Sequence, residues 1–198
     1  MRNPIVEKVL LTEEEIAKRV EELARTIAGE EEEEEETYEV VLPCLTGALF
    51  FGADFVRAFA RARGYKSLEI GYCQPPSSYA GKATVSNNND SSGRVFVRGR
   101  VRNKNVLVVE DIVDTGGTLS KLANALLNDH KAKSVAVVAL LNKQERRISG
   151  CEKELKKTLR KRYIGFEIPD EFVVGYGLDY DGLYRDLPFI GVPKPEVL

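Results

Sequence analysis

Apolar residues along the chain fall into two kinds of segment that alternate. Short, almost continuously apolar runs are typical of strands buried on both faces of a sheet, and they occur at residues 38–44, 67–73, 105–110 and 134–141. Between them, apolar residues recur every three or four positions, as in helices that pack one face on a core, at residues 12–29, 48–63 and from 119 onward. This alternation predicts an α/β fold with a central parallel sheet flanked by helices.

Local signals refine the two ends of the first predicted helix. Thr12 and Glu15 have the spacing of a capping box, and the helix is expected to end near Gly29. Seven consecutive glutamates follow at residues 30–36, and because like charges repel, this run is predicted to be a solvated, mobile acidic connector.

Two later segments carry little material for a core. Residues 74–93 are rich in Ser, Asn, Gly and Pro. A mobile lid loop and a simple surface loop are both compatible with this composition. A strand is predicted directly after it, at residues 94–101. Towards the C-terminus, short apolar runs separated by polar loops at residues 173–192 predict a small cap from chain-terminal segments over the sheet edge.

Composition narrows the class of protein. A chain of 198 residues is expected to form one domain, and a formal net charge of −2 argues against nucleic acid as a partner. The basic residues at 156–162 are interpreted as a solvated helix face. Three widely spaced cysteines and a single histidine exclude a disulfide framework and a zinc site; Cys44 is expected to be a core thiol. No signal peptide or membrane span is evident, so a cytoplasmic location is expected.

The segment VLVVEDIVDTGGTL at residues 106–119 carries the most specific chemistry. A buried strand leads into Glu110 and Asp111, a third carboxylate follows at Asp114, and small residues then open a helix. In α/β sheets ligands bind at the carboxyl ends of strands, and N–H groups at a helix start bind phosphate. An ordinary strand-to-helix turn with an Asp cap is the alternative, but the adjoining acidic pair favours a site for a phosphorylated ribose.

This segment resembles the phosphoribosyl-diphosphate-binding motif of type I phosphoribosyltransferases. Ser77-Ser78-Tyr79 and the stretch FEIPDEFVVGYGLDYDGLYRDLPFIGV at residues 166–192 are similar to the 6-oxopurine (hypoxanthine-guanine) branch of that family, and the resemblance covers residues 9–192. It implies the type I phosphoribosyltransferase fold and a purine-salvage reaction. Ribose 5-phosphate passes from phosphoribosyl diphosphate to a purine nitrogen, giving a nucleoside monophosphate (IMP or GMP) and pyrophosphate.

The resemblance also assigns roles near the motif. Glu110 and Asp111 match the acidic pair that holds the ribose hydroxyls, directly or through Mg²⁺, and Asp114 matches the catalytic carboxylate near the purine N7 proton. The 5-phosphate loop corresponds to Thr115, Gly116, Gly117 and Thr118.

Further along the chain, the resemblance identifies the groups that contact the base. Lys143 matches the lysine that reads the 6-oxo group, Phe172 the ring stacked on the base, and Val173 the backbone that reads its edge. Asp179 matches a ligand of a second Mg²⁺, and Arg185 a pyrophosphate contact.

Two loops complete the implied site. Leu45, Thr46 and Gly47 match the loop whose backbone amides contact pyrophosphate, which in the family can carry a non-proline cis peptide; Thr46 stands where many relatives have lysine. Ser78 and Tyr79 match the mobile lid, which would exclude water from the ribosyl centre.

The resemblance further implies a homodimer or homotetramer without a membrane or nucleic-acid partner. Alternatives are a regulatory module that keeps the fold but senses nucleotides or binds RNA, and transfer to adenine, orotate or uracil. The slightly negative charge argues against the first, and Lys143 with residues 166–192 against the second. The sequence does not rank hypoxanthine, guanine and xanthine.

Overall fold

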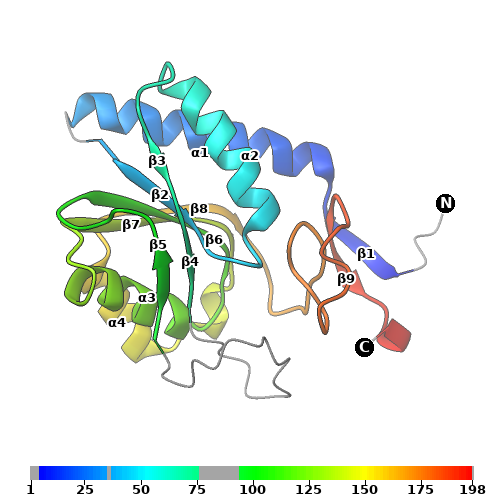
Figure 1. Ribbon diagram of the computed structural model, residues 1–198. Helices are drawn as coiled ribbons and strands as arrows, with labels where there is room; N and C mark the ends of the chain where they lie inside the picture. The colour runs from blue at the N-terminus through cyan, green and yellow to red at the C-terminus, as the bar shows by residue number, and fades with distance from the viewer. Residues whose placement is uncertain (1–4, 35–36, 76–93, 198) are drawn as a thin grey trace.

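A five-stranded sheet forms the centre of the computed structural model, which describes residues 5–34, 37–75 and 94–197 (Figure 1). Every neighbouring pair in this sheet is parallel, and the strand order is β3-β2-β6-β7-β8. The strands are β2 (Val40–Pro43), β3 (Glu69–Ile70), β6 (Asn105–Val113), β7 (Ser134–Asn142) and β8 (Arg162–Glu167). The predicted α/β class with a central parallel sheet is therefore confirmed.

Helices cover both faces of this sheet. Helices α1 (Glu13–Glu33) and α2 (Leu49–Ala62) lie on one face, and α3 (Gly117–Asn128) and α4 (Ser149–Thr158) lie on the other (Figure 1). Because successive side chains of a strand point to opposite faces, Leu107 packs into the core beneath α1 and α2, whereas Val106 belongs to the core beneath α3 and α4. Double burial explains why the central strands are continuously apolar.

Two small antiparallel pairs complete the described fold. Strand β1 (Val6–Leu11) pairs with β9 (Ile190–Pro193), so segments from the two chain ends form the predicted cap beside the sheet (Figure 1). Strand β4 (Tyr72–Gln74) pairs with β5 (Phe96–Arg98). Short 3₁₀ turns occur at η1 (Gln144–Arg146) and η2 (Pro195–Val197). Among the described residues, none of the helices is both long and apolar enough to cross a bilayer.

Some predicted strand boundaries were wrong. The run 67–73 is divided into β3 and β4 at Gly71, where a Cβ would lie 2.0 Å from the carbonyl oxygen of Arg98. The close approach of that backbone requires glycine and breaks the strand. The predicted strand 94–101 is reduced to the three residues of β5, whereas β6 continues past the acidic pair to Val113.

The prediction of a solvated acidic connector at residues 30–36 was wrong in part: Glu32, Glu33 and Glu34 are exposed, but the run is helical through Glu33 and Glu31 is buried. The Thr12–Glu15 capping box is present, but α1 continues past Gly29 to Glu33. Glu31 is 5% exposed, and its carboxylate lies 2.6 Å from Nε of Arg63, which is itself buried. A paired charge can be buried where an isolated one cannot, so repulsion along the run does not decide its structure. Residues 35 and 36 lie outside the described part.

The basic residues at 156–162 are likewise more than a solvated helix face. Lys161 lies 2.7 Å from Glu30 and also pairs with Glu34, which in turn lies 2.6 Å from Arg160. Hydrogen bonding to Lys161 lowers the pKa of the Glu30 carboxyl below its ordinary value. These ion pairs join the C-terminal end of α1 to the start of β8, so the acidic run and the basic run are partners.

Candidate active site

The carboxyl ends of three neighbouring strands bring the predicted site residues to one edge of the sheet. Because β2, β6 and β7 are parallel, the segments that follow Pro43, Val113 and Asn142 begin at the same edge. The predicted pyrophosphate loop (residues 45–47) follows β2, the predicted phosphate loop (residues 115–118) follows β6, and Lys143 follows β7. Residues separated by about a hundred positions along the chain therefore meet in space.

The acidic pair lies near the end of β6 in largely buried surroundings. Burial raises the pKa of the Glu110 carboxyl well above its ordinary value, and the neighbouring charge of Asp111 raises it further. Burial also raises the pKa of Asp111, although hydrogen bonds with Glu110 and the Ile112 amide, and the nearby Arg185 cation, oppose this effect. Two adjoining carboxylates are thus held where hydroxyl donors or a cation would stabilise their charged forms.

The loop that follows β2 packs directly against this pair. The Leu45–Thr46 peptide is cis, as the family resemblance allowed, and the Leu45 amide donates to the Cys73 carbonyl at 2.8 Å. A Cβ placed on Gly47 would lie only 1.8 Å from Oδ2 of Asp111. Glycine at this position therefore lets the loop backbone lie against the carboxylate. The expected core thiol of Cys44, just before the loop, is buried.

The C-terminal cap segment reaches the same loop from the other side. Gly177 has a φ of +104°, and a Cβ there would lie 1.9 Å from the Gly47 carbonyl oxygen. Arg185 donates to the Gly177 carbonyl at 2.5 Å and forms an ion pair with Asp179 at 2.8 Å. Asp179 and Arg185 are thereby placed beside the pyrophosphate loop and the acidic pair.

The phosphate loop has the form expected of an anion site at a helix start. Gly116, with a φ of +84°, is the residue before α3, and Gly117 and Thr118 are the first two residues of that helix. The Thr115 hydroxyl accepts from the Gly117 amide at 3.4 Å. N–H groups in the first turn of a helix point along its axis and bind phosphate oxygens. Residues 115–118 therefore have the backbone arrangement that such an anion site requires.

A cluster of charges lies where the base is expected. Lys143 is 7% exposed, and its Nζ lies 3.7 Å from Asp170, which in turn lies 3.1 Å from Arg146. Nε of Arg146 also lies 2.7 Å from Oδ1 of Asp114. The sequence prediction found Lys143 and Asp114 but missed Arg146 and Asp170. The position of Arg146, three residues after Lys143, was the only available signal. Nothing in the sequence indicated that its side chain pairs with Asp114.

The remaining predicted residues differ in how far the structure describes them. Phe172 is 43% exposed and its ring meets Tyr180 edge-on at 6.0 Å, which leaves ring surface open to a partner, whereas Val173 is buried. Ser78 and Tyr79, the predicted lid residues, lie outside the described part of the chain, as does most of residues 74–93; Gln74 itself belongs to β4.

No group of three or more histidine, cysteine or acidic side chains able to hold a metal is found within the described residues. The chemistry of the donors fits a hard cation such as Mg²⁺, which is typically held by only one or two carboxylates, here from Glu110, Asp111 or Asp179, while substrate and water supply its other ligands.

Comparisons with known proteins identify the family of the chain. Residues 8–181 match the phosphoribosyl transferase domain. The hypoxanthine-guanine phosphoribosyltransferase of Bacillus subtilis is 39% identical over 196 residues, a match that covers 97% of this chain and 96% of that protein. The enzyme of the same name from Lactococcus lactis is 36% identical, with 97% and 93% covered.

Solved structures show the same likeness in three dimensions. The hypoxanthine phosphoribosyltransferase of Trypanosoma cruzi, in complex with its product IMP, superposes with a TM-score of 0.78 at 32% identity and full coverage of both chains. That of Staphylococcus aureus gives a TM-score of 0.71 at 35% identity, covering 97% of this chain and 94% of that one. The chain therefore belongs to the phosphoribosyl transferase domain family, within its hypoxanthine-guanine phosphoribosyltransferase branch.

Proposed function

We propose that the protein is a purine-salvage enzyme that transfers ribose 5-phosphate from phosphoribosyl diphosphate to a 6-oxopurine: hypoxanthine, guanine or xanthine. The observation that carries this proposal is the meeting, at one sheet edge, of a buried acidic pair, a phosphate loop and a lysine that follows the next strand. Relatives named hypoxanthine-guanine phosphoribosyltransferase match over nearly the whole chain, and a structural relative binds IMP.

The donor would be bound at three places. Backbone N–H groups and the hydroxyls of Thr115 and Thr118 hold the 5-phosphate, and the carboxylates of Glu110 and Asp111 face the ribose hydroxyls. The pyrophosphate lies against the amides of residues 45–47 and the Arg185 guanidinium, whose fork suits phosphate oxygens. Three anchors fix the anomeric carbon in position, and such orientation accounts for a large part of the acceleration in transfer reactions.

The acceptor would be read by hydrogen bonds to its oxo edge. The buried Lys143 ammonium donates to the 6-oxo oxygen, whereas adenine presents an amino donor there and offers the lysine no acceptor. Phe172 offers a ring face to the base, and the Val173 backbone reads its edge. As the purine nitrogen bonds to the anomeric carbon, the bond to pyrophosphate breaks with its electron pair, and Asp114 accepts the proton from N7.

We propose Mg²⁺ as the cofactor, held by Asp179 and by the acidic pair together with substrate oxygens. When bound, the ion supplies positive charge that offsets the negative charge on the pyrophosphate leaving group. Support comes from the donor set, because carboxylate oxygens are the ligands that Mg²⁺ prefers. Removal of divalent cations with a chelator is expected to abolish turnover, and added Mg²⁺ to restore it. A cytoplasmic homodimer or homotetramer is the proposed working form, which sedimentation of the purified protein would test.

Incubation with phosphoribosyl diphosphate, Mg²⁺ and a panel of bases tests the function. Separation of nucleotides by chromatography should show IMP from hypoxanthine and GMP from guanine, each matched by pyrophosphate release. Asp114→Asn should remove most of this turnover, because it removes the proposed proton acceptor. Asp129→Asn is its matched control: Asp129 follows α3 away from the sheet edge, so its substitution should leave rates unchanged. Absence of nucleotide from hypoxanthine, guanine and xanthine alike would overturn the proposal.

A further inference from the structure

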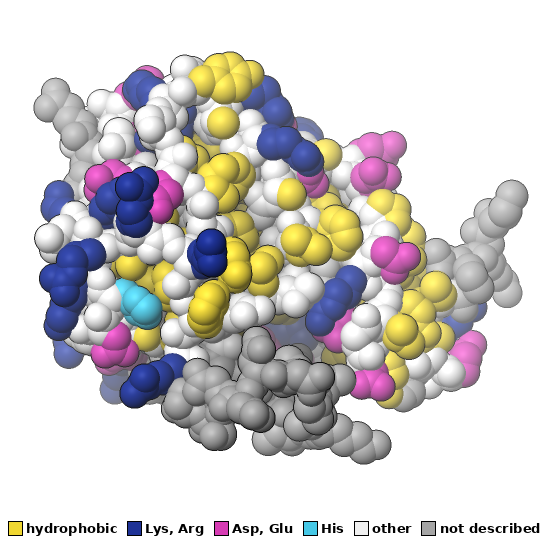
Figure 2. Space-filling model, in the orientation of Figure 1, with side chains coloured by type: hydrophobic (Ala, Val, Ile, Leu, Met, Phe, Trp, Pro, Cys, Tyr) yellow, Lys and Arg dark blue, Asp and Glu magenta, His cyan; other side chains and the backbone are white. Residues whose placement is uncertain are grey.

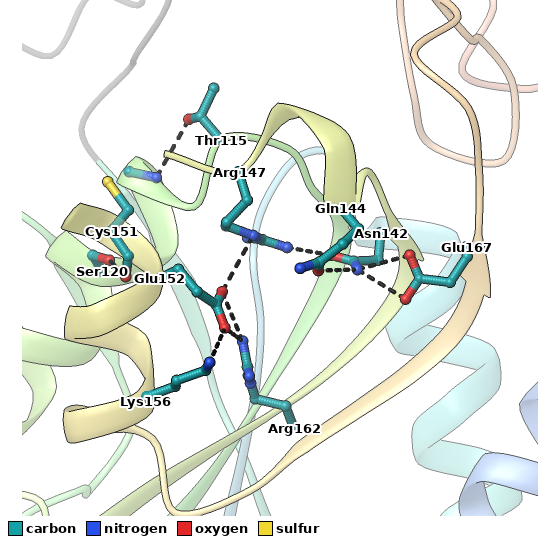
Figure 3. A network of polar contacts seen from close by, with 11 residues as sticks. Thr115, Ser120, Asn142, Gln144, Arg147, Cys151, Glu152, Lys156, Arg162 and Glu167 are labelled. Atoms are coloured by element: carbon teal, nitrogen blue, oxygen red, sulfur yellow. Dashed lines mark hydrogen bonds and ion pairs between the residues drawn. The ribbon is translucent and has the colours of Figure 1, made fainter. Parts of the chain in front are cut away.

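Arg147 lies directly behind the phosphate loop, although no part of the mechanism above uses it (Figure 3). It follows Arg146 in the segment that also supplies Lys143, and its side chain is only 5% exposed. Burying a guanidinium is costly unless its charge is paired, so a buried arginine beside a phosphate site calls for a physical explanation.

The contacts of Arg147 hold its guanidinium in one place. Nη2 donates to the side-chain oxygen of Asn142 at the end of β7, and Nε lies 3.5 Å from the Glu152 carboxylate of α4. Nη1 and Nε have no hydrogen-bond partner among the described residues, and Nη1 forms no ion pair with them either. A Cβ on Gly116 would lie 2.9 Å from this Nη1, so the guanidinium occupies the space beside Gly116 that a side chain would otherwise fill.

The segment around Arg147 is also bonded to the phosphate loop. The Ile148 amide donates to the Thr115 carbonyl at 3.1 Å, and the Lys143 amide donates to the Val113 carbonyl at 3.0 Å. These two bonds lie on either side of Arg147 in sequence. A shift of the arginine would therefore be passed to the phosphate loop through backbone contacts.

The countercharge of Arg147 is shared with other cations. The Glu152 carboxylate lies 2.9 Å from Arg162, 3.5 Å from Arg147 and 3.7 Å from Lys156, so its shortest ion pair is with Arg162 (Figure 3). One carboxylate therefore faces three cations, although Glu167 and Asp114 also act electrostatically on Arg147. The charge of the buried guanidinium acts over several ångströms on an anion bound at the loop.

We propose that Arg147 is a positioning residue for phosphate binding, which supports the loop at residues 115–118 from behind and supplies positive charge that favours a dianionic phosphate on its front. The identity of that phosphate as the 5-phosphate of a ribose rests on the proposed function. The arginine is not expected to touch the substrate; it acts through the Gly116 backbone and through its field.

Paired ligands with and without the phosphate test this role. Arg147→Gln should weaken IMP binding about tenfold in titration calorimetry while changing the affinity for inosine, which lacks the phosphate, by less than about twofold. Arg147→Lys, which keeps the charge, should recover most of the loss. A cavity of about 330 Å³ borders Arg147, Asn142 and Glu152, so water can hydrate the groups that the glutamine variant leaves unpaired, and the variant is expected to fold.

Two further variants separate this role from a merely structural one. Glu152→Gln removes the countercharge but keeps the arginine, so IMP should bind as tightly as in the unaltered protein or more tightly, whereas a purely structural network predicts weaker binding. Arg63→Gln removes another buried, ion-paired guanidinium far from the loop. It should lower the melting temperature but leave the ratio of IMP to inosine affinity unchanged.

The outcome does not depend on which base the protein accepts. Ribose 5-phosphate serves as a base-independent probe, and its affinity should also fall about tenfold in Arg147→Gln. Equal weakening of IMP and inosine, or unchanged affinity for both phosphates, would overturn the proposal even if the enzyme turns over hypoxanthine. Phosphate-selective loss in a protein that makes no nucleotide would support the role of Arg147 and overturn only the proposed function.

Discussion

Replacement of Gly47 by alanine should damage the donor site while leaving the fold nearly intact. The new Cβ would lie 1.8 Å from Oδ2 and 2.7 Å from Cγ of Asp111, whereas real Cβ contacts essentially never fall below 3.0 Å. The carboxylate must therefore move by more than 1 Å or the loop must move away from it. Rotation of Asp111 is the easier response, because its carboxylate is the end of a side chain and the loop backbone is held by hydrogen bonds.

The expected magnitude follows from that displacement. A misplacement of about 1 Å in a group that orients substrate costs roughly 100-fold in rate, so kcat/KM for phosphoribosyl diphosphate should fall by about that factor. Rotation also disturbs the 2.7 Å hydrogen bond from the Ile112 amide to Asp111. Loss of one such bond costs about 1 kcal/mol, so the melting temperature should fall by only a few degrees.

Initial rates with varied donor at saturating hypoxanthine, together with thermal unfolding, measure both effects. Gly29→Ala is the matched control, because a Cβ on this helical glycine meets nothing within 4 Å. It should stabilise the protein by about 0.5–1 kcal/mol and leave kcat/KM unchanged. A Gly47→Ala enzyme whose kcat/KM stays within about threefold of the original would refute the reasoning about Asp111.

Four further substitutions test other parts of the account. Asp114→Asn should lower kcat by about 10²–10⁴ while the dissociation constant of phosphoribosyl diphosphate, measured by calorimetry, stays nearly constant; near-normal turnover would exclude an essential proton role. Lys143→Met should reduce kcat/KM for hypoxanthine but not for adenine, and an unchanged ratio would remove this lysine from base selection. Arg185→Ala should weaken pyrophosphate binding about tenfold, and an unaltered inhibition constant would place it outside the site. Glu31→Ala should lower the free energy of unfolding, measured in urea, by about 3–5 kcal/mol because it leaves the buried Arg63 cation without its partner. Glu32→Ala, which removes an exposed ion pair, should lower it by about 0.5 kcal/mol or less, and equal losses in the two variants would contradict the role of the buried pair.

The sequence predicts well those features that depend on neighbouring residues. Continuous apolar runs identified the central strands, and the Thr12–Glu15 spacing identified the start of α1. The order of carboxylates and small residues at the end of β6 and in the turn after it placed Asp111 and Gly116 at the sheet edge. In each case the physical cause, whether burial on both faces or a free helix start, acts within a few residues.

Features that depend on distant partners were not predictable in this way. The acidic run is interpreted as solvated because its charges repel locally, yet Glu31 pairs with Arg63 and Glu30 pairs with Lys161 across the fold. Arg146 turns back to Asp114 from the next strand's loop, and only the parallel pairing of β6 with β7 brings the two together. Charge patterns alone do not specify which partner the tertiary fold supplies.

The ratio of kcat/KM for hypoxanthine to that for adenine, with phosphoribosyl diphosphate as donor, tests the central claim most directly. A site that pairs a buried lysine with a 6-oxo oxygen should reject the amino analogue by a factor of about 10⁴ or more. The account predicts such a ratio together with IMP and pyrophosphate formed in equal amounts. Comparable values for the two bases, or no nucleotide from hypoxanthine, would contradict it.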